Sequence, residues 1–256
     1  MNSSLPKPMH TVAGVPMIER VLRAGAGARP DRIGLVVSRE TIILASTLGL
    51  SDDIQIVIQD PPRGTGDAVR QGFEAIPDVD RLIVLFIDHP LLQPLTVAEL
   101  LHGSRLSGSK VTLLSAVLAD PAAFGRVVRD SEGRPVGVVE RKDDDPALRE
   151  GRTEVYSGMM ALDAAWARDA LQGLRPSRAT GELYLTELVA IAVGGADSNH
   201  PWPVATVQGS ADDALGVNDR VDLARAESRA WERNGEKLMR AGVTMRLPET
   251  IVVDEE

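Results

Sequence analysis

The sequence contains no cysteine among its 256 residues. This absence excludes disulfide bonds, zinc sites built on thiolates and a cysteine nucleophile. Aromatic residues are scarce, at 3%, so the core must be built from Val, Leu, Ile and Ala. The sequence has neither a run of about 18 apolar residues nor a basic N-terminal segment followed by an apolar run. We therefore expect no membrane span and no secretory signal, and the default location is the cytoplasm.

Basic residues are outnumbered by acidic ones, 28 against 37, which gives a formal net charge of −9. A general nucleic-acid surface needs a basic footprint, so we expect no nucleic-acid partner. A small anionic substrate remains compatible with this charge, because a few local Lys, Arg and backbone donors suffice to bind it. The 43% of apolar residues is ordinary for a soluble globular protein, and the length allows a large core.

Short β-branched runs alternate with helical patterns along the chain. This alternation predicts an α/β fold, a Rossmann-like doubly wound and mostly parallel sheet with helices on both faces. The turn residues between 126–129 and 135–139 predict a small β-hairpin that projects from this sheet. We expect one domain over 1–240, followed by a linker over 241–256. Strands are predicted at 33–37, 54–58, 82–87, 111–118, 155–162 and 204–207, and helices at 16–26, 39–48, 66–75, 97–105, 164–173, 182–193 and 219–241.

Two local features point to a nucleotide beside a metal ion. Gly64-Thr65-Gly66 opens onto a predicted helix, where unpaired backbone N–H groups suit an anion. Thr65 is also a plausible N-cap of that helix. The apolar run 82–87 ends on Asp88, and an acid at the carboxyl end of a buried strand lies where open α/β sheets bind ligands.

Several segments, in a consistent order over nearly the whole chain, carry a resemblance to a known family. They include Leu-Pro-Lys at 5–7, Gly-Thr-Gly at 64–66 and Gly-Val-Asn at 216–218. The chain resembles the sugar-1-phosphate nucleotidyltransferases, and more narrowly the uridylyltransferase domain of bacterial bifunctional enzymes that make UDP-N-acetylglucosamine. The matching segments are 5–17, 59–66, 88–91, 124–126, 139–143, 156–158, 180–187, 216–220 and 241–250.

This resemblance implies a reaction and its partners. The phosphate of N-acetylglucosamine 1-phosphate attacks the α-phosphorus of UTP in line, and pyrophosphate leaves, in the synthesis of cell-envelope precursors. Mg²⁺ and a lysine neutralise the charge, so that catalysis is mainly positioning and electrostatics. The resemblance ends where the family's acetyltransferase β-helix begins, so we expect neither that activity nor its trimer interface in this chain.

The resemblance also assigns the phosphate and metal residues. Lys7 is expected to contact the nucleotide phosphates as the catalytic lysine, although a lysine in an N-terminal loop is usually solvated. Asp88 and the amide oxygen of Asn218 are expected to bind Mg²⁺, which takes oxygen ligands and needs only one or two from the protein. For Asn218 the alternative is a helix N-cap.

The base and sugar subsites are assigned in the same way. The resemblance places three residues at the uracil: Gln59, Gly64 and Thr65. The side chain of Gln59 suits this role because a primary amide offers both a donor and acceptors. For Gln59 the alternative is a polar strand end. Gly125, Glu140 and Tyr156 are expected at the sugar, and Glu140 alone would be read as a solvated strand-end residue.

Three departures from the family pattern keep alternatives open. The family's loop of the form Leu-x-Ala-Gly-x-Gly-Thr-Arg-Met coincides with this chain only at Met1, so we expect the phosphate loop and the first, central strand to be missing, with two strand edges left unpaired. Ile87 stands where the family usually has Gly, and Tyr156 where it usually has Asn. The alternatives are another sugar 1-phosphate or dTTP as substrate, or a non-catalytic remnant that binds a nucleotide or sugar phosphate.

Overall fold

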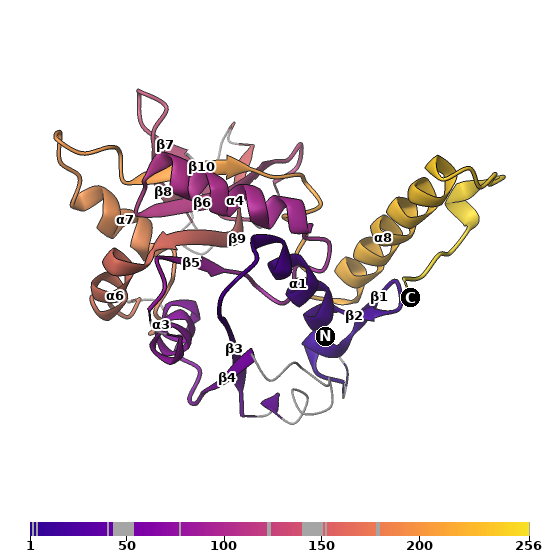
Figure 1. Cartoon of the computed structure of the whole chain (residues 1–256), viewed down its shortest axis with the longest axis horizontal. Coiled ribbons are helices and arrows are strands. Elements are labelled where there is room, and N and C mark those ends of the chain that lie inside the picture. The colour runs from indigo at the N-terminus through magenta and orange to yellow at the C-terminus, as the bar shows by residue number, and fades with distance from the viewer. Residues whose placement is uncertain are drawn as a thin grey trace.

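A computed structural model describes residues 1, 3, 5–39, 41–42, 54–76, 78–121, 124–139, 151, 153–177 and 180–255. Helices and strands alternate over much of this length (Figure 1). The predicted helix at 39–48 falls largely outside the described residues. In chain order the elements are η1 (Lys7–Met9), β1 (Thr11–Val12), β2 (Val15–Pro16), α1 (Met17–Gly25), η2 (Ala26–Ala28), β3 (Ile33–Ser38), β4 (Ile54–Gln59), α3 (Thr65–Ala75), β5 (Arg81–Val84), α4 (Pro94–Ser107), β6 (Val111–Val117), β7 (Arg126–Arg129), β8 (Pro135–Val139), β9 (Glu154–Asp163), α6 (Ala164–Gln172), α7 (Glu187–Gly194), β10 (Val204–Gln208), α8 (Arg220–Arg240) and η4 (Pro248–Thr250).

The large sheet has six strands, ordered β10-β6-β9-β7-β8, with β5 also paired to β9. β6 runs parallel to β10, whereas β9 runs antiparallel to both β5 and β6. Because β7 is also antiparallel to β9, the four strands β5, β6, β7 and β10 share one direction, which confirms the predicted α/β fold with a mostly parallel sheet. The reversal of β9 goes beyond the prediction, because apolar periodicity does not report the direction of a strand.

The predicted hairpin is confirmed, since β7 and β8 pair antiparallel. It is joined to the large sheet at the start of β9, where Arg126 lies opposite Val155. Most predicted boundaries differ from the structure by a few residues, and two of these differences affect the candidate site. β5 ends at Val84 rather than at residue 87, and α7 begins at Glu187 rather than at residue 182. In both cases the residues outside the element make contacts at the candidate site described below.

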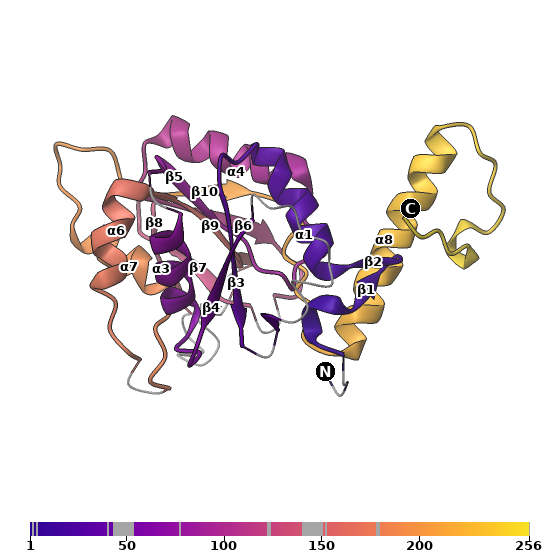
Figure 2. The same ribbon diagram turned by 60° about the horizontal axis from the view of Figure 1, so that its bottom comes forward.

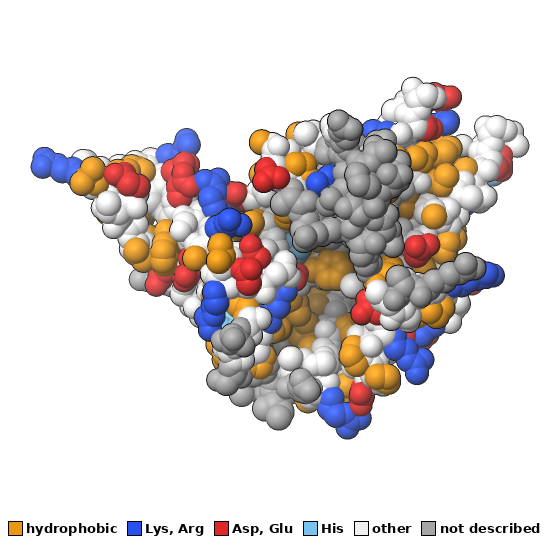
Figure 3. Space-filling model, turned by 180° about the vertical axis from the view of Figure 1, so that it is seen from behind, with side chains coloured by type: hydrophobic (Ala, Val, Ile, Leu, Met, Phe, Trp, Pro, Cys, Tyr) orange, Lys and Arg blue, Asp and Glu red, His pale blue; other side chains and the backbone are white. Residues whose placement is uncertain are grey.

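A second sheet contains only β3 and β4, which pair in parallel. Among the described residues β3 pairs only with β4, and β5 pairs only with β9. Each of these two strands therefore keeps one unpaired edge, as expected from the sequence. A cavity of about 520 Å³ is lined by residues of both strands, including Leu35 and Leu82, together with apolar residues of α1 and α3. Figure 3 shows a hollow with a hydrophobic floor on the face opposite to that of Figure 1.

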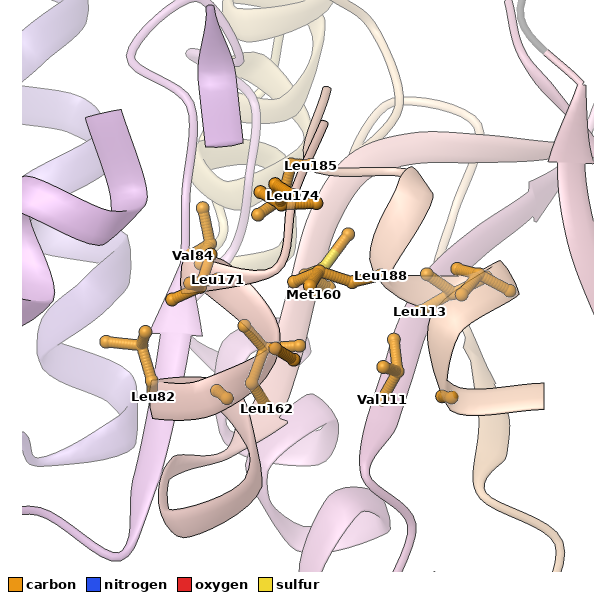
Figure 4. Packing of buried hydrophobic residues seen from close by; sticks show 14 of the residues in the cluster. Leu82, Val84, Val111, Leu113, Met160, Leu162, Leu171, Leu174, Leu185 and Leu188 are labelled. Atoms are coloured by element: carbon orange, nitrogen blue, oxygen red, sulfur yellow. The ribbon is translucent and has the colours of Figure 1, made fainter. Parts of the chain in front are cut away.

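The core lies on both faces of the large sheet because neighbouring strand residues point to opposite sides. Leu113 and Met160 belong to a core cluster that includes residues of α3, α6 and α7. Figure 4 shows them with Leu171 of α6 and Leu188 of α7. Their chain neighbours Leu114 and Met159 pack instead with α4. Helices therefore cover both faces, as predicted, and Figure 2 shows α4 separated by the sheet from α6 and α7.

α8 and the residues after it form an arm beside the sheet (Figure 2). The C-terminal tail returns to the short β1–β2 hairpin, where the Glu255 N–H donates to the Ala13 carbonyl at 2.9 Å. Arg20 of α1 also donates to the Glu255 carboxylate at 2.6 Å. A search of the described residues finds no helix with the length and apolar character of a membrane span.

Candidate active site

Lys7, Asp88 and Asn218 come together although they lie far apart in the sequence. The Lys7 Nζ donates to Asp88 Oδ2 at 2.7 Å and to Asn218 Oδ1 at 3.1 Å. Asp88 follows the end of β5, and Lys7 begins the single turn of η1. The backbone explains the approach of Asn218, because the N–H of Val217 donates to the carbonyl of Asp88 at 2.8 Å. Two oxygen ligands therefore converge on one cation, the Lys7 ammonium.

The side chain of Asn218 is free of the capping role that its sequence position suggests. Asp219 is the N-cap of α8, and its carboxylate accepts from the N–H groups of Val221 and Asp222. The Asn218 backbone N–H donates to Asp222 instead. Its amide oxygen therefore remains directed at Lys7.

The donor set at this site suits Mg²⁺. Asp88 contributes a carboxylate oxygen and Asn218 an amide oxygen, both hard ligands, and both already meet a positive charge. Among the described residues no group of three or more His, Asp or Glu could hold a metal ion. A site with two protein oxygens matches a cation that takes its other ligands from water and phosphate.

His89 lies next to the Asp88 carboxylate, and the sequence does not indicate this contact. It is buried, with Nδ1 3.3 Å from the carbonyl of Asp213 and Nε2 3.7 Å from Asp88 Oδ1. Burial lowers the pKa of His89, and the nearby Asp88 carboxylate offsets this only in part. Gly158 and Gly216 pack against the ring, where an added Cβ would lie 3.5 and 3.3 Å from Nε2. A neutral imidazole therefore fixes the floor of the site.

The Gly64–Gly66 loop is tied to the segment before α7. The Gly66 N–H donates to the carbonyl of Leu183, and Thr65 Oγ1 accepts from the N–H of Leu185. Gly64, at φ 103°, is the N-cap residue, so the expected capping by Thr65 is wrong. A Cβ on Gly64 would lie 2.6 Å from the Leu183 carbonyl oxygen, which explains the glycine. The N–H of Gly66 is occupied by protein rather than left for an anion.

Gln59 lies at the end of β4 and reaches back to this loop. Its Nε2 donates to the Gly64 carbonyl at 3.1 Å and to Asp67 Oδ2 at 2.9 Å. Asp67 is only 1% exposed and also accepts from Arg70 and Gln71. Burial alone would raise the pKa of Asp67, but the hydrogen bonds from Gln59, Gln71 and Arg70 outweigh it and lower the pKa. The sequence gives no sign of this buried carboxylate beyond its place in a helical first turn.

Of the residues predicted at the sugar, those that the structure describes make contacts within the protein. Tyr156 is buried in the main core, and its hydroxyl donates to the carbonyl of Gly158. The Gly125 carbonyl accepts from the Tyr156 N–H at 2.9 Å, so these two residues do lie side by side. Glu140 falls outside the described residues. Ile87 packs against a cluster that contains Ile18 and Leu35.

The N-terminal part of the chain is similar to a known protein family. Residues 1–150 match the model of the MobA-like NTP transferase domain. The chain belongs to the MobA-like NTP transferase family. The matched residues include Lys7, Asp88 and the Gly64–Gly66 loop, so this assignment and the geometry of the site refer to the same part of the molecule.

Curated relatives extend the similarity over nearly the whole chain. The bifunctional protein GlmU of Alkalilimnicola ehrlichii is 38% identical over 250 residues, which are 97% of this chain and 52% of that protein. The GlmU proteins of Bordetella parapertussis and Pseudomonas aeruginosa are 37% and 34% identical, and this chain covers 53% and 54% of them. The chain thus spans about half the length of the curated relatives that it matches.

A solved structure supports the fold. The structure of CMP:2-keto-3-deoxy-manno-octonic acid synthetase complexed with CTP superposes with a TM-score of 0.67, covering 90% of this chain and 94% of that one. Because the sequences are only 19% identical, this similarity concerns the fold alone. It agrees with the α/β architecture of a nucleotidyltransferase family member.

Proposed function

We propose that this protein transfers a uridylyl group from UTP to N-acetylglucosamine 1-phosphate, with release of pyrophosphate and with Mg²⁺ as cofactor. The convergence of Lys7, Asp88 and Asn218 carries this proposal. The general class, nucleotidyl transfer to a sugar phosphate, follows from the family and the GlmU relatives. The choice of UTP and of this sugar rests on the sequence resemblance. A cytoplasmic location stays a prediction.

The three residues have distinct chemical roles in this proposal. Asp88 and Asn218 would hold the metal ion, which would supply positive charge to the phosphate oxygens of the nucleotide. Lys7, whose ammonium contacts both of these oxygens, would supply a further positive charge to the same phosphates. The positive charge then faces the transferring group, where negative charge develops during in-line attack. Neutral His89 beneath Asp88 leaves the carboxylate charge available to the metal.

The experiment that tests this function is a pyrophosphate-release assay with a panel of substrates. Purified protein is combined with Mg²⁺, each of UTP, dTTP and CTP, and each of several sugar 1-phosphates. The chain is assayed alone and with a family-type phosphate loop joined ahead of Asn2. We expect UTP with N-acetylglucosamine 1-phosphate to give the largest kcat/KM. Turnover only with another nucleotide and sugar 1-phosphate would overturn the proposed substrates. If both forms of the protein fold and neither turns over any pair of substrates, the proposed function is overturned.

Ile87 and Tyr156 favour a second candidate, a different sugar 1-phosphate. Tyr156 has its hydroxyl on the Gly158 carbonyl and its ring in the core, so it does not present an amide to a sugar. The glucose and galactose 1-phosphates in the panel address this alternative, since they lack the N-acetyl group. A kcat/KM higher for one of them than for N-acetylglucosamine 1-phosphate would establish it.

A further inference from the structure

The buried carboxylate of Asp67 has a consequence for base recognition. Asp67 Oδ2 accepts from both Gln59 and Gln71, and Oδ1 accepts from Arg70. The side chain is 1% exposed, so these protein donors rather than water satisfy it. An ionised carboxylate can only accept hydrogen bonds. The group of the Gln59 side chain that faces Asp67 must therefore be its NH₂.

A second acceptor favours the same orientation of Gln59. The Gly64 carbonyl lies 3.1 Å from Gln59 Nε2, and a carbonyl also requires a donor. With one hydrogen on Gly64 and one on Asp67, both donors of the amide are used. The carbonyl oxygen Oε1 has no hydrogen-bond partner within the described part of the chain. The two contacts thus select one of the two flips of the amide without reference to any ligand.

We propose that Asp67 is a positioning residue that holds the Gln59 amide with its carbonyl available to the base, and so makes the site select uracil or thymine over cytosine. This inference rests on the proposed function, in which Gln59 lies at the base. Position 3 of uracil and thymine carries an N–H, which donates to a carbonyl. Position 3 of cytosine is a bare acceptor, and it would face the carbonyl oxygen of Gln59 with no hydrogen between them.

The same reasoning separates Asp67 from its neighbours. Gln71 donates to the same oxygen of Asp67 at 2.7 Å, but no contact joins it to Gln59 among the described residues. Removal of Gln71 leaves both acceptors of the Gln59 NH₂ in place. Replacement of Asp67 by Asn changes one acceptor-only group into an amide, which can present either oxygen or NH₂, so that only the Gly64 carbonyl still favours this orientation of Gln59.

Nucleotide binding measured by calorimetry tests the proposal without any turnover. Affinities for UTP and CTP are measured with Mg²⁺ for the wild type, Asp67→Asn and Gln71→Ala. We expect the wild type to bind UTP at least about tenfold more tightly than CTP. Asp67→Asn should reduce this ratio roughly tenfold, through weaker UTP binding and stronger CTP binding, and Gln71→Ala should leave it within about twofold. If Asp67→Asn lowers the affinities for UTP and CTP equally, or leaves both unchanged, the proposal is overturned.

A measurement on the unmodified protein covers the case in which Asp67→Asn does not fold or no nucleotide binds. The side-chain NH₂ of Gln59 is followed by hydrogen exchange in NMR spectra, with the exposed amide of Gln208, which donates no side-chain hydrogen bond to the described residues, as control. We expect the Gln59 hydrogens to exchange at least about tenfold more slowly than those of Gln208, because both hydrogens of Gln59 are hydrogen-bonded. Equal exchange rates would overturn the claim that hydrogen bonds hold the orientation of the Gln59 amide. Loss of catalysis with slow exchange would instead overturn only the proposed function.

Discussion

The ammonium group of Lys7 lies 2.7 Å from the carboxylate of Asp88, across 81 positions of sequence. Asn218 completes the contact from a third segment of the chain. The side chains of Lys7 and Asp88 are 36% and 29% exposed, so their ion pair contributes little to folding, about 0–1 kcal/mol. The arrangement is better explained by ligand binding, with the ammonium at the place proposed for Mg²⁺.

Substitution of Lys7 should have opposite effects on metal binding and on catalysis. In Lys7→Met the two oxygens no longer hold an ammonium, so Mg²⁺ affinity without nucleotide should rise roughly tenfold. Turnover should fall by about 10²–10³, because the lysine charge on the phosphates is lost. Calorimetry and pyrophosphate release measure the two quantities, and Lys237→Met on the exposed side of α8 is the control. Weaker metal binding in Lys7→Met would contradict this account.

Asn218 and Asp219 are adjacent but should respond in opposite ways to alanine. Asp219 caps α8 through two backbone N–H groups, so Asp219→Ala should lower the free energy of unfolding by about 1 kcal/mol and leave Mg²⁺ dependence unchanged. Asn218→Ala should raise the Mg²⁺ concentration needed for half-maximal activity and change stability little. Urea unfolding and magnesium titrations of both variants give the comparison. Identical behaviour of the two would contradict the assigned roles.

The sequence predicts most of the fold and part of the site, and the differences have physical reasons. Apolar periodicity locates the strands, and the rule that ligands meet the carboxyl ends of parallel strands places Asp88. The resemblance brings in Lys7 and Asn218. The reversal of β9 and the buried position of Asp67 depend on long-range packing, which local patterns do not record. The N-cap assigned to Thr65 is wrong because α3 already begins at Thr65, after Gly64, and the Thr65 hydroxyl instead accepts from the N–H of Leu185, 120 residues away.

Gly64 should tolerate substitution far less than Gly181, although both have positive φ, 103° and 75°. A Cβ on Gly64 would lie 2.6 Å from a backbone oxygen, whereas nothing lies within 4 Å at Gly181. Gly181→Ala should therefore cost about 1–2 kcal/mol from backbone strain alone. Gly64→Ala should cost more and should also weaken UTP binding. Thermal unfolding of both proteins provides the test, and an equal loss of stability would count against the packing described here.

Asp212 links α8 to the body of the molecule in a pH-dependent way. Burial would raise its pKa, but Arg229 and Arg233, at 2.9 and 2.8 Å, lower it below the ordinary 3.8. Because the unfolded chain binds this proton more readily, the stabilisation is full above about pH 4 and is lost as pH falls below 3.8. Asp212→Asn should be less stable by about 1 kcal/mol at pH 7. This gap should narrow in urea unfolding at pH 3; a constant gap would contradict the ion pairs.

The rate of pyrophosphate release by Asp88→Asn tests the central claim most directly. The measurement uses UTP, N-acetylglucosamine 1-phosphate and saturating Mg²⁺, with the wild type assayed in parallel and circular dichroism as a check of folding. If Asp88 holds the metal that serves nucleotidyl transfer, kcat should fall by about 10²–10³ or more while the thermal unfolding temperature changes little. A folded Asp88→Asn protein that releases pyrophosphate at the wild-type rate would contradict the account.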